Sequence, residues 1–190
     1  MNKANKTQAT STLRIIGGVH RGRKLPIPHL PGLRPTSDRI RETVFNWLQF
    51  DLPGMQVLDL FAGTGALGLE ALSRDATHAV LVEPQSQAAR ALSQSLDLLK
   101  LTNAEVKMMT AGQFLLTPVR PFDLVFVDPP FDLDLWSETL HVLVDNGWLA
   151  PGGLIYLESP KHQSIDIPLG LQTIKEKTGG KVRFRLLKMA

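Results

Sequence analysis

Hydrophobic residues in the second part of the chain form short runs, separated by segments long enough for a helix. From residue 55 this pattern predicts strands at 56–61, 79–82, 105–109, 124–127 and 154–158, and helices at 66–74, 85–100 and 133–146. Such alternation is typical of a parallel sheet with helices on both faces. The run Val-Phe-Val at 125–127 is apolar throughout, as expected of a central strand buried on both sides.

The end of the chain departs from this alternation. Segments 172–177 and 181–187 flank Thr178-Gly179-Gly180, and apolar and basic residues mostly alternate along the second of them. Period-two alternation around a glycine turn predicts a β-hairpin. The sheet is therefore expected to finish with antiparallel strands.

The beginning of the chain has its own pattern. Residues 1–12 are polar and predict a disordered tail, and 13–53 predict an extension in front of the main domain, 54–190. In the extension, two β-like runs flank Gly17-Gly18, which resembles a hairpin turn, and prolines predict an extended connector at 26–35. A helix is expected from a cap at 36–38 to about Gln49. Its apolar face carries Ile40, Val44, Trp47 and Leu48, whereas Arg39, Arg41 and Glu42 fall elsewhere.

Composition narrows the class of protein. A chain of 190 residues with 43% hydrophobic residues fits one globular domain, and no apolar run is long enough to span a bilayer. The polar N-terminus lacks a secretory signal, which favours a cytoplasmic location. With no cysteine, disulfides, thiolate metal sites and a cysteine nucleophile are excluded. The five histidines lack ligand-like spacing, so no metal site is expected.

Charge is divided unevenly along the chain. Residues 1–50 carry nine Lys/Arg and two Asp/Glu, a net charge of +7, and the remaining twelve Lys/Arg and sixteen Asp/Glu give −4. A basic arm on an acidic body favours RNA as partner, the alternative being a solvated tail. The candidate contacts to RNA are Arg14, His20, Arg21, Arg23, Lys24, Arg34, Thr36, Arg39 and Arg41. Lys175, Lys177, Lys181, Arg183, Arg185 and Lys188 form a second basic cluster, for which a solvated face is an equal alternative.

A glycine-rich segment from Asp59 to Gly68 follows one predicted strand and opens a helix. Its glycines spell G-x-G-x-x-G, and Glu83, at the end of the next strand, is placed to accept both ribose hydroxyls of a nucleoside. This much fits NAD as well as S-adenosylmethionine. Asp59 favours the latter, because a carboxylate repels a pyrophosphate and suits an ammonium group; otherwise it only caps the turn. The candidate cofactor contacts here are Asp59, Phe61, Ala62, Gly63, Thr64, Gly65, Glu83 and Pro84.

The second motif, Asp128-Pro129-Pro130-Phe131, directly follows the buried 124–127 strand. Two prolines end the strand and fix the turn. Because ligands bind at the carboxyl ends of parallel strands, Asp59, Glu83 and Asp128 are expected to face one crevice. The alternative is a rigid turn with Phe131 in the core.

Amino-group chemistry gives this turn a role. An exocyclic amino group of a nucleobase is a poor nucleophile, and two acceptors on its hydrogens localise its lone pair. The Asp128 carboxylate and the Pro129 carbonyl are the candidate acceptors, and Phe131 is the candidate stacking ring, an interaction of roughly 1–3 kcal/mol. Positioning and preorganised acceptors then carry the catalysis without a metal or covalent intermediate. The target base has to be single-stranded or flipped out.

Several segments together resemble the RsmD family: LRIIGG from residue 13, RGRKL from 21, GLRPTSDRIRETVFNWL from 32, FAGTGALGLEALSR from 61, VFVDPPF from 125 and DNGWL from 145. The resemblance covers essentially 13–187. It implies a class I methyltransferase, with a seven-stranded, mostly parallel sheet ending in a reversed hairpin and S-adenosylmethionine as cofactor. It further implies N2-methylation of one guanine (position 966 in the usual rRNA numbering) of 16S rRNA in the bacterial small ribosomal subunit. We expect a monomer.

One position departs from related enzymes, many of which carry Asp or Asn after the third strand to read the adenine amino group. The matching residue here is Thr110. We therefore expect adenine contacts from the backbone of Ala111 and Gly112, or from the Thr110 side chain.

Three other functions fit parts of the pattern. Methylation of adenine N6 or of a protein glutamine also uses a DPP turn followed by an aromatic residue. The basic arm disfavours the glutamine substrate, and the lack of a separate recognition domain disfavours DNA. An NAD-dependent oxidoreductase leaves the DPPF turn without a role, and a non-catalytic RNA-binding protein does not need it.

Overall fold

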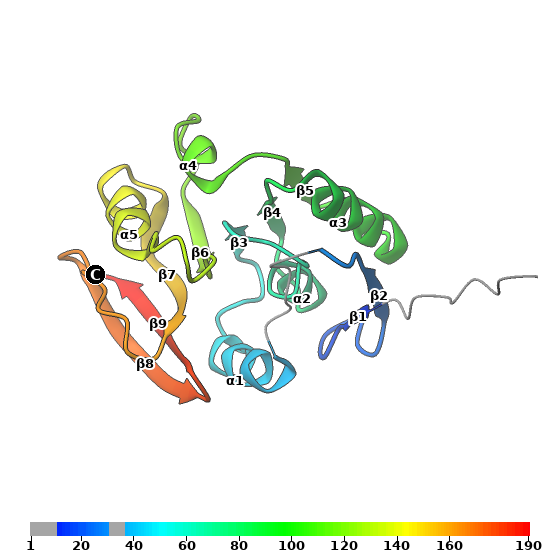
Figure 1. Cartoon of the computed structure of the whole chain (residues 1–190), viewed down its shortest axis with the longest axis horizontal. Helices are drawn as coiled ribbons and strands as arrows, with labels where there is room; N and C mark the ends of the chain where they lie inside the picture. The colour runs from blue at the N-terminus through cyan, green and yellow to red at the C-terminus, as the bar shows by residue number, and fades with distance from the viewer. Residues whose placement is uncertain (1–10, 31–36) are drawn as a thin grey trace, which may run out of the picture.

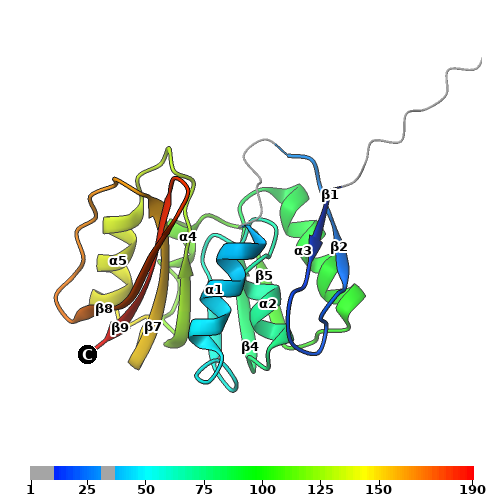
Figure 2. The same cartoon turned by 90° about the horizontal axis from the view of Figure 1, so that it is seen from below.

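A seven-stranded sheet carries helices on both faces (Figures 1 and 2). The computed structural model describes residues 11–30 and 37–190. Its strands are β1 (Ser11–Arg14), β2 (Lys24–Ile27), β3 (Gln56–Asp59), β4 (His78–Val82), β5 (Ala104–Lys107), β6 (Phe122–Val127), β7 (Leu149–Pro160), β8 (Leu171–Gly179) and β9 (Val182–Met189). Its helices are α1 (Asp38–Leu48), α2 (Gly68–Ser73), α3 (Ser86–Leu99), α4 (Ala111–Phe114) and α5 (Trp136–Asp145).

The strand order is β5-β4-β3-β6-β7-β9-β8. Strands β3 to β7 pair in parallel, whereas β9 pairs antiparallel with both β7 and β8. The predicted fold class, a mostly parallel sheet ending in an antiparallel hairpin, is confirmed. After β5 at one edge, the chain returns to place β6 on the other side of β3, so a crevice is expected at the carboxyl ends of β3 and β6.

Two hydrophobic clusters fill the two faces of the sheet. One joins residues of α1, α2 and α3 with the β1–β2 hairpin, and the other joins residues of α4 and α5. The 125–127 run is fully buried between the clusters, since Phe126 faces the first while Val125 and Val127 face the second. Among the described helices, none is long and apolar enough to cross a membrane.

The N-terminal prediction needs two corrections. Strand β1 begins at Ser11, within the predicted tail, because Ser11 and Thr12 pair with Ile27 and Pro26 of β2. The hairpin does not turn tightly at Gly17-Gly18: its connection runs over residues 15–23. The connection stays long because its backbone bonds to α2, with the Val19 amide donating to the Ser73 carbonyl at 2.7 Å. The rest of the predicted tail, 1–10, and connector residues 31–36 lie outside the described residues.

Helix α1 begins as predicted, since the Ser37 hydroxyl caps it by accepting from the Ile40 amide at 3.4 Å. Helix α4 is an element that the hydrophobic pattern did not reveal. It is short and rests on a capping box: the Thr110 hydroxyl accepts from the Gln113 amide, and the Gln113 side chain accepts from the Thr110 amide. Thr-x-x-Gln is a sequence signature of a helix start, so the signal was present in the sequence.

Candidate active site

Four polar residues stand in a row at the carboxyl edge of the sheet. In the spatial order β5, β4, β3 and β6, they are Thr110 and Glu83 beyond the ends of their strands, Asp59 as the last residue of β3, and Asp128 directly after β6. With about 4.8 Å between neighbouring strands, the row spans roughly 14 Å. The predicted convergence of Asp59, Glu83 and Asp128 on one edge thus agrees with the topology, and the row is long enough for a nucleoside joined to an amino acid.

Asp59 lies at the centre of this row and is buried. Burial raises the pKa of its carboxyl group to about 7, the Glu83 charge adds to the rise, and the Gly68 and Phe61 amides oppose it. Its Oδ2 accepts the Gly68 amide at 2.9 Å. Asp59 therefore both caps α2 and remains a carboxyl group that a nearby cation would ionise.

The glycine loop after β3 is held by the end of β4. Glu83 is buried, and its two carboxylate oxygens accept the Gly63 amide at 3.0 Å and the Gln85 amide at 2.7 Å. Burial raises the pKa of Glu83. A carboxylate has about four acceptor sites, so Glu83 keeps capacity for a ligand while it fixes the loop.

The loop backbone needs glycine where it passes α3. Gly65 has φ +80°, and a Cβ there would lie 2.6 Å from a Leu92 methyl group. The remaining predicted contacts in and after the loop differ in exposure: Ala62 is buried, Phe61 and Thr64 are half-buried, and Pro84 is exposed. The loop is thus a rigid turn with partly accessible residues on its outer side.

The segment after β5 places Thr110 as the N-cap of α4. Its hydroxyl is engaged in the capping box, Ala111 is buried and Gly112 is exposed. First-turn amides of a helix lack partners within the helix. This geometry agrees better with the expected backbone contacts of Ala111 and Gly112 than with a contact from the Thr110 side chain.

The DPPF turn presents one ring to solvent. Asp128 is half-buried, Pro129 is buried, and Phe131 is 44% exposed. The Phe131 ring lies with its centroid 5.9 Å from the Trp136 ring, at an interplanar angle of 51°. Phe131 is therefore an accessible ring supported from behind, as a stacking platform needs to be, and not a core residue.

A buried pair behind this turn was missed from the sequence. The Tyr156 hydroxyl donates to Glu158 Oε2 at 2.6 Å, and the Glu158 carbonyl accepts from Trp136 Nε1 at 2.7 Å. Register between β6 and β7 pairs Val127 with Leu157, which sets Asp128 beside Glu158. Burial, the Glu158 charge and the Asp128 charge raise the pKa of Tyr156. Glu158 could have been found, because it too stands at the carboxyl end of a predicted strand.

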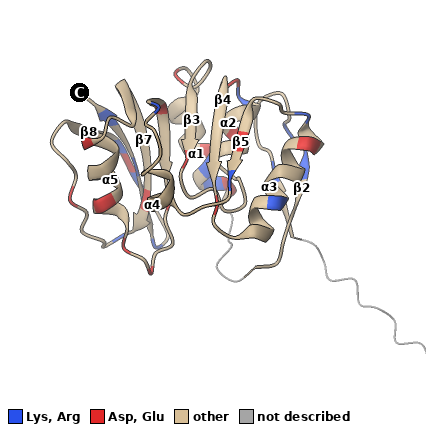
Figure 3. Cartoon of the chain, turned by 90° about the horizontal axis from the view of Figure 1, so that it is seen from above, with Lys and Arg blue, Asp and Glu red and all other residues tan. Residues whose placement is uncertain are grey.

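The predicted RNA contacts divide between two ends of the molecule. Arg23 donates to the Leu98 carbonyl near the end of α3, and the His20 amide donates to the Ser73 hydroxyl at the end of α2. Because α2 begins at the glycine loop, its far end lies toward the opposite, amino edge of the sheet. His20, Arg21 and Arg23 therefore lie away from the DPPF turn, on the connection between β1 and β2. Figure 3 shows β2, which carries Lys24, beside α3.

Other members of the predicted set lie elsewhere. Lys24 is exposed on β2, and Arg14 pairs with Asp38 at the start of α1, at 3.1 Å. Arg39 is exposed on the first turn of α1, beside the turn between β8 and β9. Arg34 and Thr36 fall outside the described residues.

Arg41 was wrongly grouped with the exposed basic residues. Its side chain is only 1% exposed, because it points from α1 into the junction of hairpin, glycine loop and α2. There it donates to the Arg14 carbonyl at 2.9 Å and pairs with Glu70 at 3.6 Å. Its other contacts are Asp38 at 2.6 Å and the Ala66 carbonyl at 3.4 Å. Arg41 is a structural link and is not available to RNA. Arg185 of the second cluster is likewise buried.

Known proteins are similar to this chain over nearly its whole length. A family model described as Conserved hypothetical protein 95 matches residues 13–188. Ribosomal RNA small subunit methyltransferase D of Escherichia coli K12 is 48% identical over 187 residues, 98% of this chain and 94% of that protein. The protein of the same name from Haemophilus influenzae is 42% identical over 190 residues, 98% of each chain.

Solved structures share the fold. The putative methyltransferase yhhF from Escherichia coli superposes with a TM-score of 0.88 at 46% identity, covering 94% of this chain and 98% of that one. The putative methyltransferase SMU.776, complexed with SAH, gives a TM-score of 0.64 at 13% identity, covering 78% of this chain and 49% of that one. The second likeness bears on the fold alone.

Proposed function

Because the chain belongs to the RsmD family of rRNA methyltransferases, we propose that it transfers a methyl group from S-adenosylmethionine to N2 of one guanine in 16S rRNA of the small ribosomal subunit. The observation that carries this proposal is the row of Thr110, Glu83, Asp59 and Asp128 along one edge of the sheet. In this proposal Thr110, Glu83 and Asp59 contact the cofactor, and Asp128 accepts the amino group beside it.

The residues of the row fit this cofactor. Asp59, with a pKa near 7, takes the negative form beside the cofactor's ammonium group. Glu83 retains acceptor sites that would hold the ribose hydroxyls, and the first amides of α4 would hold the adenine. Bound there, S-adenosylmethionine supplies the methyl group.

The DPPF turn holds the amino group that receives it. The Asp128 carboxylate and the Pro129 carbonyl accept the two N2 hydrogens, which localises the nitrogen lone pair. As the nitrogen–carbon bond forms, the bond between the methyl carbon and the sulfonium sulfur would break, and the sulfur would keep the electron pair as a neutral thioether. The nitrogen loses one hydrogen as a proton, and Asp128 accepts it. Phe131 stacks on the guanine ring from the solvent side. The base has to leave its stack to reach this turn.

The basic residues position the RNA in two areas. Arg14 and Arg39 flank the start of α1, while His20, Arg21, Arg23 and Lys24 lie on and beside the hairpin connection. We propose that the second area contacts rRNA at a distance from the target base. Contacts of this kind add affinity without reading sequence.

The test is methyl transfer to small subunits from a strain lacking this gene, followed by mass spectrometry of the nucleosides. We expect N2-methylguanosine at one position of 16S rRNA with the wild-type protein. Asp128→Ala should lower kcat by about 100-fold to 1,000-fold, the cost of removing one preorganised polar partner, with unchanged affinity for S-adenosylhomocysteine.

Asp132→Ala is the matched control, because Asp132 is an exposed carboxylate close to the same turn. Its activity should equal that of the wild type. Appearance of N6-methyladenosine in place of N2-methylguanosine would replace the substrate while keeping the chemistry. Full activity of Asp128→Ala would refute the proposed mechanism.

A further inference from the structure

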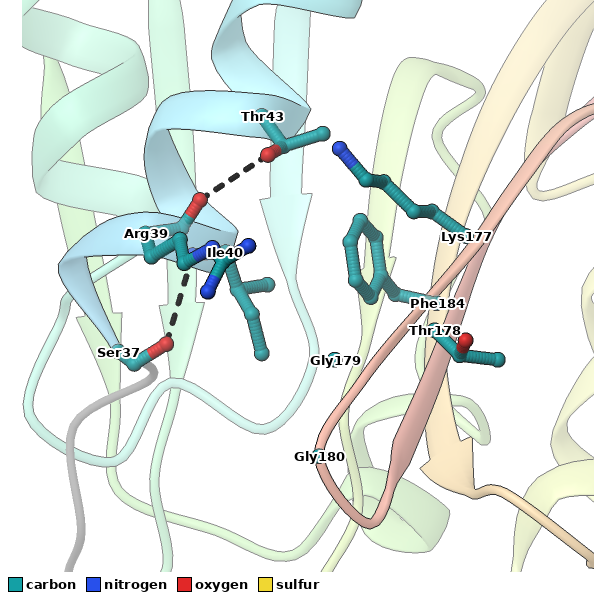
Figure 4. A pocket seen from close by; sticks show the side chains of 9 residues that line it. All are labelled: Ser37, Arg39, Ile40, Thr43, Lys177, Thr178, Gly179, Gly180 and Phe184. Carbon is teal, nitrogen blue, oxygen red and sulfur yellow. Dashed lines mark hydrogen bonds between the residues drawn. The ribbon is translucent and has the colours of Figure 1, made fainter.

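A pocket lies outside the row of Thr110, Glu83, Asp59 and Asp128. It has a volume of about 380 Å³ and lies between the first turns of α1 and the β8–β9 turn (Figure 4). The α1 cap Ser37 and the α1 residues Arg39 and Thr43 line one side, and Lys177, Thr178 and Gly179 line the other. Ile40 and Phe184 are its apolar lining residues.

The pocket lies at the same edge of the sheet as the candidate active site. Register pairs Pro160, the last residue of β7, with Val182 of β9, and Val182 with Gly179 of β8. Pro160 is three residues past Leu157, the partner of Val127, so the β8–β9 turn extends roughly 10 Å beyond the end of β6. On the other side, α1 is tied to the glycine loop by the contact of Arg41 with the Ala66 carbonyl.

The pocket combines uncompensated positive charge with hydroxyl groups and a ring. Arg39 and Lys177 are exposed, and their cationic groups form no hydrogen bond or ion pair with another residue among 11–30 and 37–190. Figure 4 shows Lys177 extending toward Thr43 across the pocket. Phe184 is backed by Trp47, with ring centroids 5.4 Å apart. Two free cations over an apolar floor suit an anion attached to a flat or apolar group.

We propose that this pocket holds one nucleotide of the substrate RNA, on the strand that carries the target guanine. The phosphodiester lies between Arg39 and Lys177, and the sugar or base lies against the partly buried Ile40, above the buried Phe184 ring. The volume is at the low end for ligand sites, which suits a single nucleotide. The inference rests on the proposed function, since it takes the ligand to be the methylated RNA.

An RNA strand is favoured over a free nucleotide by the charge of the surroundings. A free nucleotide gains only the contacts of the pocket, whereas a strand also meets Arg14 on the other side of the α1 start. Each phosphate contact makes binding more dependent on salt, so an RNA strand should show a steeper salt dependence than a free nucleotide.

The test uses three pocket variants of the full chain: Arg39→Ala, Lys177→Ala and Gly179→Leu. A Cβ at Gly179 would make ordinary contacts with Phe184 and Ile40, 3.6 to 3.8 Å away, so leucine fills the pocket without removing charge. Lys188→Ala is the control: it removes the same charge from the same hairpin, but Lys188 lies at the end of β9 that is far from the β8–β9 turn, where it pairs with Leu154.

Each variant is measured for affinity to a naked 16S rRNA transcript against salt, affinity for guanosine monophosphate, methylation of small subunits, and affinity for S-adenosylhomocysteine. We expect Arg39→Ala and Lys177→Ala to weaken RNA binding roughly threefold to tenfold and to reduce the salt slope by about one. Gly179→Leu should weaken RNA binding with an unchanged salt slope. All three variants should raise KM for small subunits and leave kcat and the affinity for S-adenosylhomocysteine unchanged. Their affinity for guanosine monophosphate should equal that of the wild type.

The outcomes separate the two proposals. If the wild type methylates small subunits and the three pocket variants behave like Lys188→Ala, the pocket assignment is wrong and the proposed function stands. If tight guanosine monophosphate binding is lost in the variants while RNA binding is kept, the pocket is a nucleotide site and the assignment to RNA is wrong. If the wild type binds S-adenosylhomocysteine but neither binds nor methylates rRNA, the proposed function fails, and the pocket assignment fails with it.

Discussion

Replacing Arg41 with methionine should destabilise the protein while keeping most of the buried volume. The Arg14 carbonyl, which accepts from Arg41 at 2.9 Å in a partly buried position, loses its donor, and an acceptor left unsatisfied costs about 1–3 kcal/mol. Glu70 keeps Arg74 at 2.7 Å and the Ile16 amide at 2.9 Å. The cost of about 3–5 kcal/mol for a fully stranded buried charge therefore does not apply.

Asp38 adds little to this loss. Its side chain is 47% exposed and keeps the ion pair with Arg14, and exposed pairs contribute about 0–1 kcal/mol. The free energy of unfolding should therefore fall by about 2–3 kcal/mol. For a chain of this size, that corresponds to a melting temperature lower by about 4–12 °C.

The assay is urea unfolding followed by tryptophan fluorescence, with a midpoint expected to fall by about 1 M. Arg39→Met is the control, because Arg39 is exposed on the same helix and should change stability by less than about 0.5 kcal/mol. A shift for Arg41→Met no larger than that of Arg39→Met would refute the structural role assigned to Arg41.

Three further predictions concern the site. Asp59 has a folded-state pKa of about 7 against an ordinary 3.8, so its contribution to stability is complete below pH 3.8 and is lost as pH rises through 7. The ammonium group of S-adenosylhomocysteine favours the ionised form of Asp59, so the affinity measured by calorimetry should rise from about pH 6 to about pH 8. Asp59→Asn should abolish this rise. Phe131→Ala should lower kcat/KM for small subunits by about fivefold to 100-fold through lost stacking, with the exposed Leu133→Ala as an unaffected control. Tyr156→Phe should cost about 1–3 kcal/mol in urea unfolding, since buried Glu158 loses its donor, and Tyr156→Phe/Glu158→Leu should recover part of it; no recovery would contradict the account of the pair.

The strands of the sheet were predictable because most of them consist of short apolar runs. Apolar runs buried on both faces, such as 125–127, are read directly from the sequence, and most predicted boundaries lie within a few residues of the observed ones. Strand β7 is the exception, since it starts at Leu149 rather than at 154. Pro151-Gly152-Gly153 indicates a turn, whereas the structure continues the strand through it with a shift of register opposite β6.

Charged residues were harder to place. Arg41 follows no apolar pattern, and its burial depends on Glu70, which is 29 positions later and itself buried. Likewise, hydrogen bonds to Ser73 and Leu98 fix the position of the 15–23 connection on α2 and α3. No local sequence signal reveals these contacts. The row of carboxylates was predictable because it depends only on strand ends and topology.

The docking of the β1–β2 hairpin has a consequence for the order of folding. The Ile16 amide bonds to Glu70, 54 residues away, and Arg23 bonds to Leu98, 75 residues away. During synthesis the hairpin leaves the ribosome before α2 and α3, and the groups that bind it are absent until those helices have followed. The hairpin is thus made before these helices but fixed after them, because closing such long loops precedes any gain from their contacts. A nascent chain therefore carries its most cationic stretch undocked until about half of the protein has been made.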